Sequence, residues 1–162
     1  MIYLITGLSF FLQNLFSLYL NYSPFFNLFV ICTLVFIYPL FQNNNHNYWR
    51  YCLIVGLFYD VILTNSLFFN TIIFVILGMI VSKINVYFVN NMYSTIFMTM
   101  FIIFSYLAIT YSILVIAGQL EFEILQFLGK FYDTILLNIV YSGLFFMIVE
   151  KLSQKYRILK MN

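Results

Sequence analysis

The stretch GLFYDVILTNSLFFNTIIFVILGMIVSK, residues 56–83, decides the fold of this chain. It is a nearly unbroken apolar run that contains one carboxylate, Asp60, and ends at one lysine, Lys83. A single helix over residues 50–83 would extend roughly 50 Å, whereas the hydrocarbon core of a bilayer is about 30 Å thick. The run is therefore predicted to form two helices that turn back on each other near Asn65.

The composition of the whole chain indicates the solvent in which this hairpin lies. Of the 162 residues, 64% are hydrophobic and 7% are charged, whereas about a quarter of the residues of soluble domains are charged. A water-soluble globule of this composition could not cover its apolar groups with polar surface, so a soluble enzyme is excluded. We predict an all-α integral membrane protein.

Short polar segments divide the apolar sequence into six candidate transmembrane spans, which form a single membrane domain over residues 1–162. The first span lacks the basic flank and the small-residue cleavage site of a removable signal peptide, so it is counted as a membrane helix. The predicted spans are residues 2–20, 25–41, 50–64, 66–83, 95–118 and 131–149.

The basic residues predict the orientation of this domain. Six spans place both termini on one side, and the tail over residues 150–162 carries four of the seven basic residues. Because basic residues concentrate on the cytoplasmic side, both termini are predicted to be cytoplasmic. The tail is interpreted as an anchor to anionic lipid at the membrane surface. The basic residues expected inside are Arg50, Lys83, Lys151, Lys155, Arg157 and Lys160, and the one expected outside is Lys130.

Asp60 is an acid at membrane depth, and such a group must face protein. A turn at Asn65 brings Asp60 and Asn70 to about the same depth, because each lies five residues from the turn. Gly56, one helical turn before Asp60, lets another backbone approach this face. We expect Asp60 to hydrogen-bond Asn70 or the turn amides near Thr64, and expect an asparagine in its place to be tolerated. A partner-binding role and a proton or ion relay remain alternatives.

The first span carries a stripe of polar residues on one face. Thr6, Ser9, Gln13 and Ser17 are spaced by three, four and four residues, so they line one side of a helix. Such a stripe faces another helix. It could join helices within this chain or form a docking seam for another membrane protein.

The segment over residues 119–133 is the one substantial piece expected outside the membrane. Its leucines, isoleucine and phenylalanines are too apolar for a solvated loop, so the segment is predicted to lie at the membrane interface. The segment could seal the helix bundle or contact a partner.

Catalytic and metal chemistry find no support in the sequence. His46 lies in a polar loop without metal-ligand spacing, and Cys32 and Cys52 read as small hydrophobic residues. Asp60 and Asp133 each follow a tyrosine, as in intramembrane aspartyl proteases, but the GxGD context of those enzymes is missing around Asp133. We therefore predict no enzyme activity, no metal, no cofactor and no nucleic-acid partner.

The hairpin resembles the rod shape-determining protein MreD family. In that family a Gly-x-x-x-Asp pair precedes a small-residue turn, an apolar residue, a glycine and a polar or aromatic position. Gly78, on the helix after the turn, is added to the predicted structural or partner-binding residues. The positions that fit are Gly56, Asp60, Thr64, Leu67 and Asn70, while Asn65 and Phe68 stand where glycine is usual.

The resemblance implies a function and a fold. It implies a non-enzymatic component of the elongasome in the bacterial cytoplasmic membrane, bound to MreC. Through MreC it would connect MreB to the peptidoglycan synthase RodA and its transpeptidase. It also implies a fold similar to the substrate-binding subunits of energy-coupling-factor transporters.

That fold supplies an alternative function, a small-molecule (vitamin) capture subunit of such a transporter. A capture subunit needs a polar cluster near the outer face and small residues, typically an alanine pair, on the first helix. The two alanines of this chain, Ala108 and Ala117, both lie elsewhere. Copurified MreC would favour the scaffold, and a copurified small molecule would favour the capture subunit.

Overall fold

The computed structural model describes residues 1–19, 27–41, 44–64, 68–85, 91–121 and 123–155. Within these ranges the chain is helical and has no strand. A 3-10 turn (Tyr38–Phe41) continues α2, and a π-helical turn (Asp60–Thr64) continues α3. The α-helices are α1 (Ile2–Tyr19), α2 (Phe29–Ile37), α3 (Asn45–Tyr59), α4 (Phe69–Ile84), α5 (Met92–Ile116) and α6 (Ile124–Lys155).

Each predicted span coincides with one of these helices, although some ends differ. Helix α2 begins at Phe29, four residues after the predicted start of its span. Helix α6 begins at Ile124, seven residues before the predicted start of the last span. The segment 124–133 is therefore the beginning of α6. It continues the helix because Phe127 packs against α5, with its ring centroid 5.6 Å from that of Tyr111.

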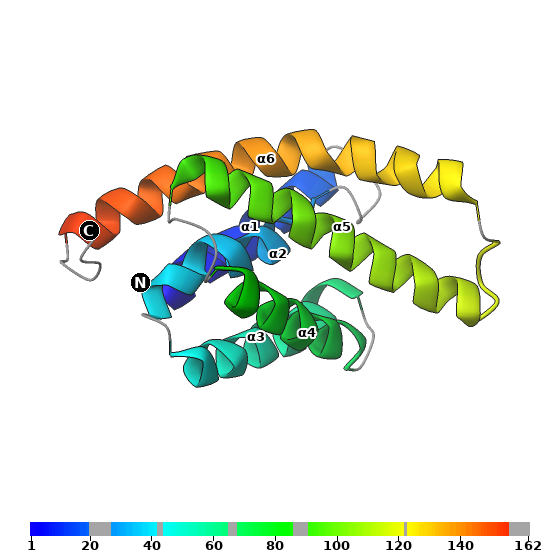
Figure 1. The fold of residues 1–162 in the computed structure, drawn as a ribbon, viewed down its shortest axis with the longest axis horizontal. Coiled ribbons are helices and arrows are strands. Elements are labelled where there is room, and N and C mark those ends of the chain that lie inside the picture. The colour runs from blue at the N-terminus through cyan, green and yellow to red at the C-terminus, as the bar shows by residue number, and fades with distance from the viewer. Residues whose placement is uncertain (20–26, 42–43, 65–67, 86–90, 122, 156–162) are drawn as a thin grey trace.

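Helix α2 forms the centre of the molecule. All nine of its residues are buried, and it contacts α1, α4, α5 and α6. In Figure 1, α5 and α6 run along one side of α2, and the α3–α4 hairpin lies on the opposite side. The first turn of α1 and the last turns of α6 lie toward the same end of the molecule (Figure 1).

Three of the described helices are long and apolar enough to cross a membrane: α1, α5 and the part of α6 up to Leu152. Helix α4 and the segment Phe29–Phe41 are apolar but shorter. At helical rise, α5 extends about 37 Å and α6 about 48 Å. These two helices project past the α3–α4 hairpin (Figure 1). Ile116 of α5 and Leu125 of α6 are each 85% exposed, and Gln126, Lys130 and Asp133 of α6 are exposed as well.

Candidate functional site: the Asp60 network

Asp60 lies where α3 passes into the π-helical turn, and its side chain is 1% exposed. A π-helical turn inserts one residue into the helical repeat and is frequent at functional sites. The backbone N–H of Asp60 still donates to the carbonyl oxygens of Gly56 and Leu57 in the helix before it. The carboxylate can therefore point toward α4 while the backbone remains hydrogen-bonded.

The carboxylate of Asp60 caps the N-terminus of α4. Its Oδ1 accepts the backbone N–H of Asn70 at 3.0 Å, and its Oδ2 accepts the backbone N–H of Thr71 at 2.9 Å. These are two of the first amides of a helix, which have no partner within the helix itself. Phe68, the residue at the N-cap position, offers no side-chain hydrogen bond. Asp60 thus takes over the capping role from outside α4.

Side-chain donors complete the environment of this carboxylate. The Asn70 amide donates to Oδ1 at 2.9 Å, the Thr71 hydroxyl donates to Oδ2 at 2.7 Å, and the Thr64 hydroxyl donates to Oδ1 at 3.3 Å. A negative charge is also favoured at a helix N-terminus by the aligned peptide dipoles. These donors and the dipole compensate for the cost of burying an ionised acid.

The network continues from α4 to α5. The Tyr106 hydroxyl donates to the side-chain oxygen of Asn70 at 2.9 Å, and the Asn70 amide also donates to the Thr64 hydroxyl at 3.1 Å. Asn70 therefore connects the π-helical turn, the start of α4 and the middle of α5. The predicted residues Asp60, Thr64 and Asn70 are brought together here.

Two glycines allow α3 and α4 to pack closely below the carboxylate. A Cβ on Gly56 would lie 2.7 Å from the Cα of Thr71, and a Cβ on Gly78 would lie 2.6 Å from the Sγ of Cys52. Real Cβ atoms do not approach other atoms so closely. Any side chain at position 56 would push the start of α4 away from Asp60.

The backbone of Phe68 is in the left-handed region, with φ of 64°. It is the only non-glycine residue with positive φ in the part of the chain that the structure describes. This conformation costs a bulky residue roughly 1–2 kcal/mol. Phe68 nevertheless adopts this conformation directly before α4. The family that the hairpin resembles usually has glycine at this position. Asn65 and Leu67, the other turn positions of the motif, lie outside the described residues.

The polar stripe of α1 faces inward and is hydrogen-bonded within the chain. Thr6 and Ser9 bond to tyrosine hydroxyls of α3 and α6. Gln13 donates to the Tyr59 hydroxyl at 3.2 Å and accepts the backbone N–H of Val30 at 3.1 Å. The three residues are buried, and they join α1 to α2, α3 and α6. Ser17 is half-buried near the other end of the stripe.

Several members of these networks were not identified from the sequence. Thr71, Tyr106 and Asn138 carry no local motif, and Asn138 accepts the backbone N–H of Leu28 at 3.0 Å from a position 110 residues away. The one sequence signal was the placement of Thr71 directly after Asn70 at the start of a helix. The hydroxyl partners of α1 are Tyr51, Tyr59 and Tyr141.

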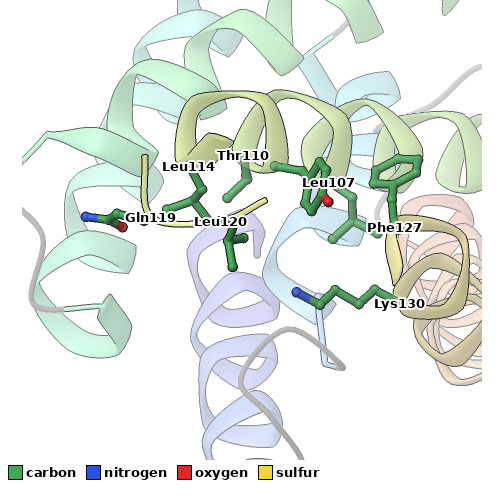
Figure 2. A pocket seen from close by; sticks show the side chains of 8 residues that line it. Leu107, Thr110, Leu114, Gln119, Leu120, Phe127 and Lys130 are labelled. Carbon is green, nitrogen blue, oxygen red and sulfur yellow. The ribbon is translucent and has the colours of Figure 1, made fainter. Parts of the chain in front are cut away.

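The residues that follow α5 hydrogen-bond back to that helix. Helix α5 ends at Ile116, and Gly118, which follows the C-cap residue Ala117, adopts φ of 70°, a conformation that suits glycine after a helix. The Tyr111 hydroxyl then donates to the carbonyl of Glu121 at 2.9 Å and accepts the N–H of Glu123 at 2.8 Å. An apolar cavity of about 230 Å³ lies between this segment and the two helices. Figure 2 shows Leu120 beside the cavity and the Lys130 side chain reaching along its edge.

The remaining predicted residues lie away from this network. Lys151 is exposed on α6, and Lys155 is the last residue of that helix. Arg157 and Lys160 lie outside the described residues. His46 is exposed near the start of α3. Among the described residues, no group of three His, Cys, Asp or Glu side chains could hold a metal ion.

The chain matches the sequence model of a known protein family. The sequence model of the rod shape-determining protein MreD family matches residues 1–156 of the 162-residue chain. No curated protein matches the chain significantly, and no solved structure does so. Because the match extends over nearly the whole length, including the Asp60 hairpin, the chain belongs to the MreD family of rod shape-determining proteins.

Proposed function

We propose that this protein is a non-enzymatic membrane scaffold of the bacterial elongasome. In this function it binds MreC and, through MreC, helps to couple MreB to peptidoglycan synthesis by RodA and its transpeptidase. The observation that carries the proposal is membership of the MreD family over residues 1–156. The family is one of shape-determining membrane proteins, and three described helices are long and apolar enough to span a bilayer.

The chemistry around Asp60 supports a structural role for this residue. A general acid or base must lie within hydrogen-bond reach of the reacting group of a substrate, and Asp60 is buried, with 1% of its surface exposed. The hydrogen-bond donors to Asp60 from Thr64, Asn70 and Thr71 are amides and hydroxyls, which do not titrate near neutral pH. The second Tyr-Asp acid, Asp133, is exposed on α6. A carboxylate held in this way stabilises a helix pair without any reaction.

The rigidity of the hairpin also suits a scaffold. Binding a partner costs less free energy when the binding surface is already ordered. The Asp60 cap, the Gly56 contact and the bond from Tyr106 to Asn70 fix α3, α4 and α5 relative to one another. We infer that this three-helix unit holds a preformed surface for MreC in the cytoplasmic membrane, with both termini of the chain in the cytoplasm.

The test uses a rod-shaped bacterium whose own MreD is depleted. The tagged full chain is expected to restore rod shape. MreC is expected to copurify with it in a detergent whose headgroup is not a sugar. A tagged membrane protein of similar size and unrelated function is the control for non-specific capture. Restored rod shape without MreC in the purified sample would contradict the binding step. MreC in the sample with cells that stay round would contradict the shape-determining role.

A further inference from the structure

A recess of about 350 Å³ with polar and apolar walls lies beside the Asp60 network. It opens between the second half of α1, the end of α3 with its π-helical turn, and the middle of α5. Smaller hydroxyl side chains and two aliphatic residues of the π-helical turn complete the lining. The larger polar groups on its walls are the amides of Gln13, Asn14 and Asn27 and the phenols of Tyr59 and Tyr106.

The recess is lined for a neutral ligand. None of its described lining residues is acidic, basic or a histidine. Asp60 lies behind the wall, where Thr64 and Asn70 contact it, and both of its oxygens accept hydrogen bonds from the protein. A charged ligand would therefore lose its hydration without gaining an opposite charge. Gln13 is bonded to Tyr59 and Val30, and Tyr106 donates to Asn70 within the protein. A neutral ligand could exchange its bonds with water for bonds to the other amides and hydroxyls of the recess, among them those of Asn14 and Asn27.

The position of the recess also calls for a polar occupant. Gln13 and Tyr106 belong to α1 and α5, two of the helices that are long and apolar enough to span a membrane. Polar side chains at such depth are found where they are buried in protein or line a polar cavity. The volume lies in the range of small-molecule sites, in which a few placed polar groups accompany apolar walls.

We propose that this recess binds a small neutral ligand rich in hydroxyl groups, of about the size of a monosaccharide. Amides that both donate and accept match the paired donors and acceptors of a sugar, and the tyrosine rings provide flat apolar surface. The same chemistry is offered by a free sugar and by the sugar headgroup of a glycolipid. This site goes beyond the scaffold function and does not depend on it.

The experiment uses the full chain in nanodiscs of phosphatidylcholine and phosphatidylglycerol. Maltoside detergents are avoided because their headgroups are themselves sugars. One arm adds methyl β-glucoside or N-acetylglucosamine and detects binding by saturation-transfer NMR. The other arm includes monoglucosyl diacylglycerol in the nanodiscs and counts glycolipid retained on the protein by native mass spectrometry. Binding in the first arm identifies a free sugar, and binding in the second arm alone identifies a headgroup.

A matched pair of variants connects binding to the recess. Ser17→Phe places a ring in the recess and is expected to weaken binding at least about tenfold, as loss of the space and of hydrogen bonds requires. Leu18→Phe adds a ring to the next residue, which is 75% exposed, and should bind as the unchanged chain does. If Ser17→Phe does not fold, Asn14→Leu in the recess is compared with Phe11→Leu on the exposed face.

Two results would overturn the proposal. One is the absence of any signal above that of empty nanodiscs in both arms. The other is equal binding by the recess variant and its control, because the ligand would then occupy another part of the chain. A signal that is lost only in the recess variant supports it.

Discussion

The Oδ2 atom of Asp60 accepts both the backbone N–H of Thr71, at 2.9 Å, and its side-chain hydroxyl, at 2.7 Å. The end of one helix thereby caps the beginning of the next. Each oxygen of the carboxylate accepts a backbone N–H group. Fewer kinds of side chain can therefore replace Asp60 than could replace an isolated acid.

Replacing Asp60 by asparagine is expected to destabilise the protein, contrary to the expectation from sequence. Asparagine has one acceptor oxygen, so its NH2 group would face either the N–H of Asn70 or that of Thr71 and leave this buried donor unsatisfied. The cost is about 1–3 kcal/mol, and Asp60→Leu should cost more. Unfolding by SDS in mixed micelles measures this loss in the free energy of unfolding. Asp133→Asn, at an exposed acid, is the control and should have no effect; equal stability of Asp60→Asn and the unchanged chain would refute the capping role.

Replacing Phe68 by glycine should stabilise the hairpin. Glycine adopts the φ of 64° at this position without the steric cost that phenylalanine bears. The gain should be about 1 kcal/mol in the free energy of unfolding. Phe68→Ala removes the same ring, which is 59% exposed, but retains a Cβ and should show no such gain. If the two variants were equally stable, the left-handed backbone would not be the source of strain.

An alanine at Gly56 should separate α3 from α4. Its Cβ would lie 2.7 Å from the Cα of Thr71, so the backbone of α4 must move and the bonds to Asp60 must lengthen. Overpacking of this kind costs about 1–3 kcal/mol, measurable by the same unfolding assay. Gly7→Ala is the matched control, since a Cβ there meets nothing within 4 Å. Equal unfolding curves for the two variants would show that the close approach is not required.

Cysteine labelling tests the orientation that the basic residues predict. A cysteine at Gln126, an exposed position of α6, should react with a membrane-impermeant maleimide on intact cells, and one at Ser153 should react only after lysis. The native Cys32 and Cys52 are buried and should give little background. Labelling of position 153 from outside, or protection of position 126, would contradict the predicted topology.

Much of the helical layout follows from patterns that are local in the chain. Apolar runs of limited length, broken by polar residues, were enough to predict a helix at each of the six positions. The pairing of Asp60 with Asn70 also came from sequence, because a short turn between two helices fixes which residues lie at equal depth. The start of α6 was misjudged, since packing of Phe127 against α5 extends that helix beyond its most apolar part.

The sequence by itself determined the membrane class and the helix pair in which Asp60 lies opposite Asn70, because composition and spacing act locally. Only the tertiary structure decided how the helices are capped. The N-cap residues of α2 and α4 are Leu28 and Phe68, which have no capping side chain. Their helices receive acceptors from other elements: Gln13 and Asn138 for α2, and Asp60 for α4. No local pattern predicts the bonds to α2, because they form only when folding brings Gln13 and Asn138 to amides that would otherwise lack a partner.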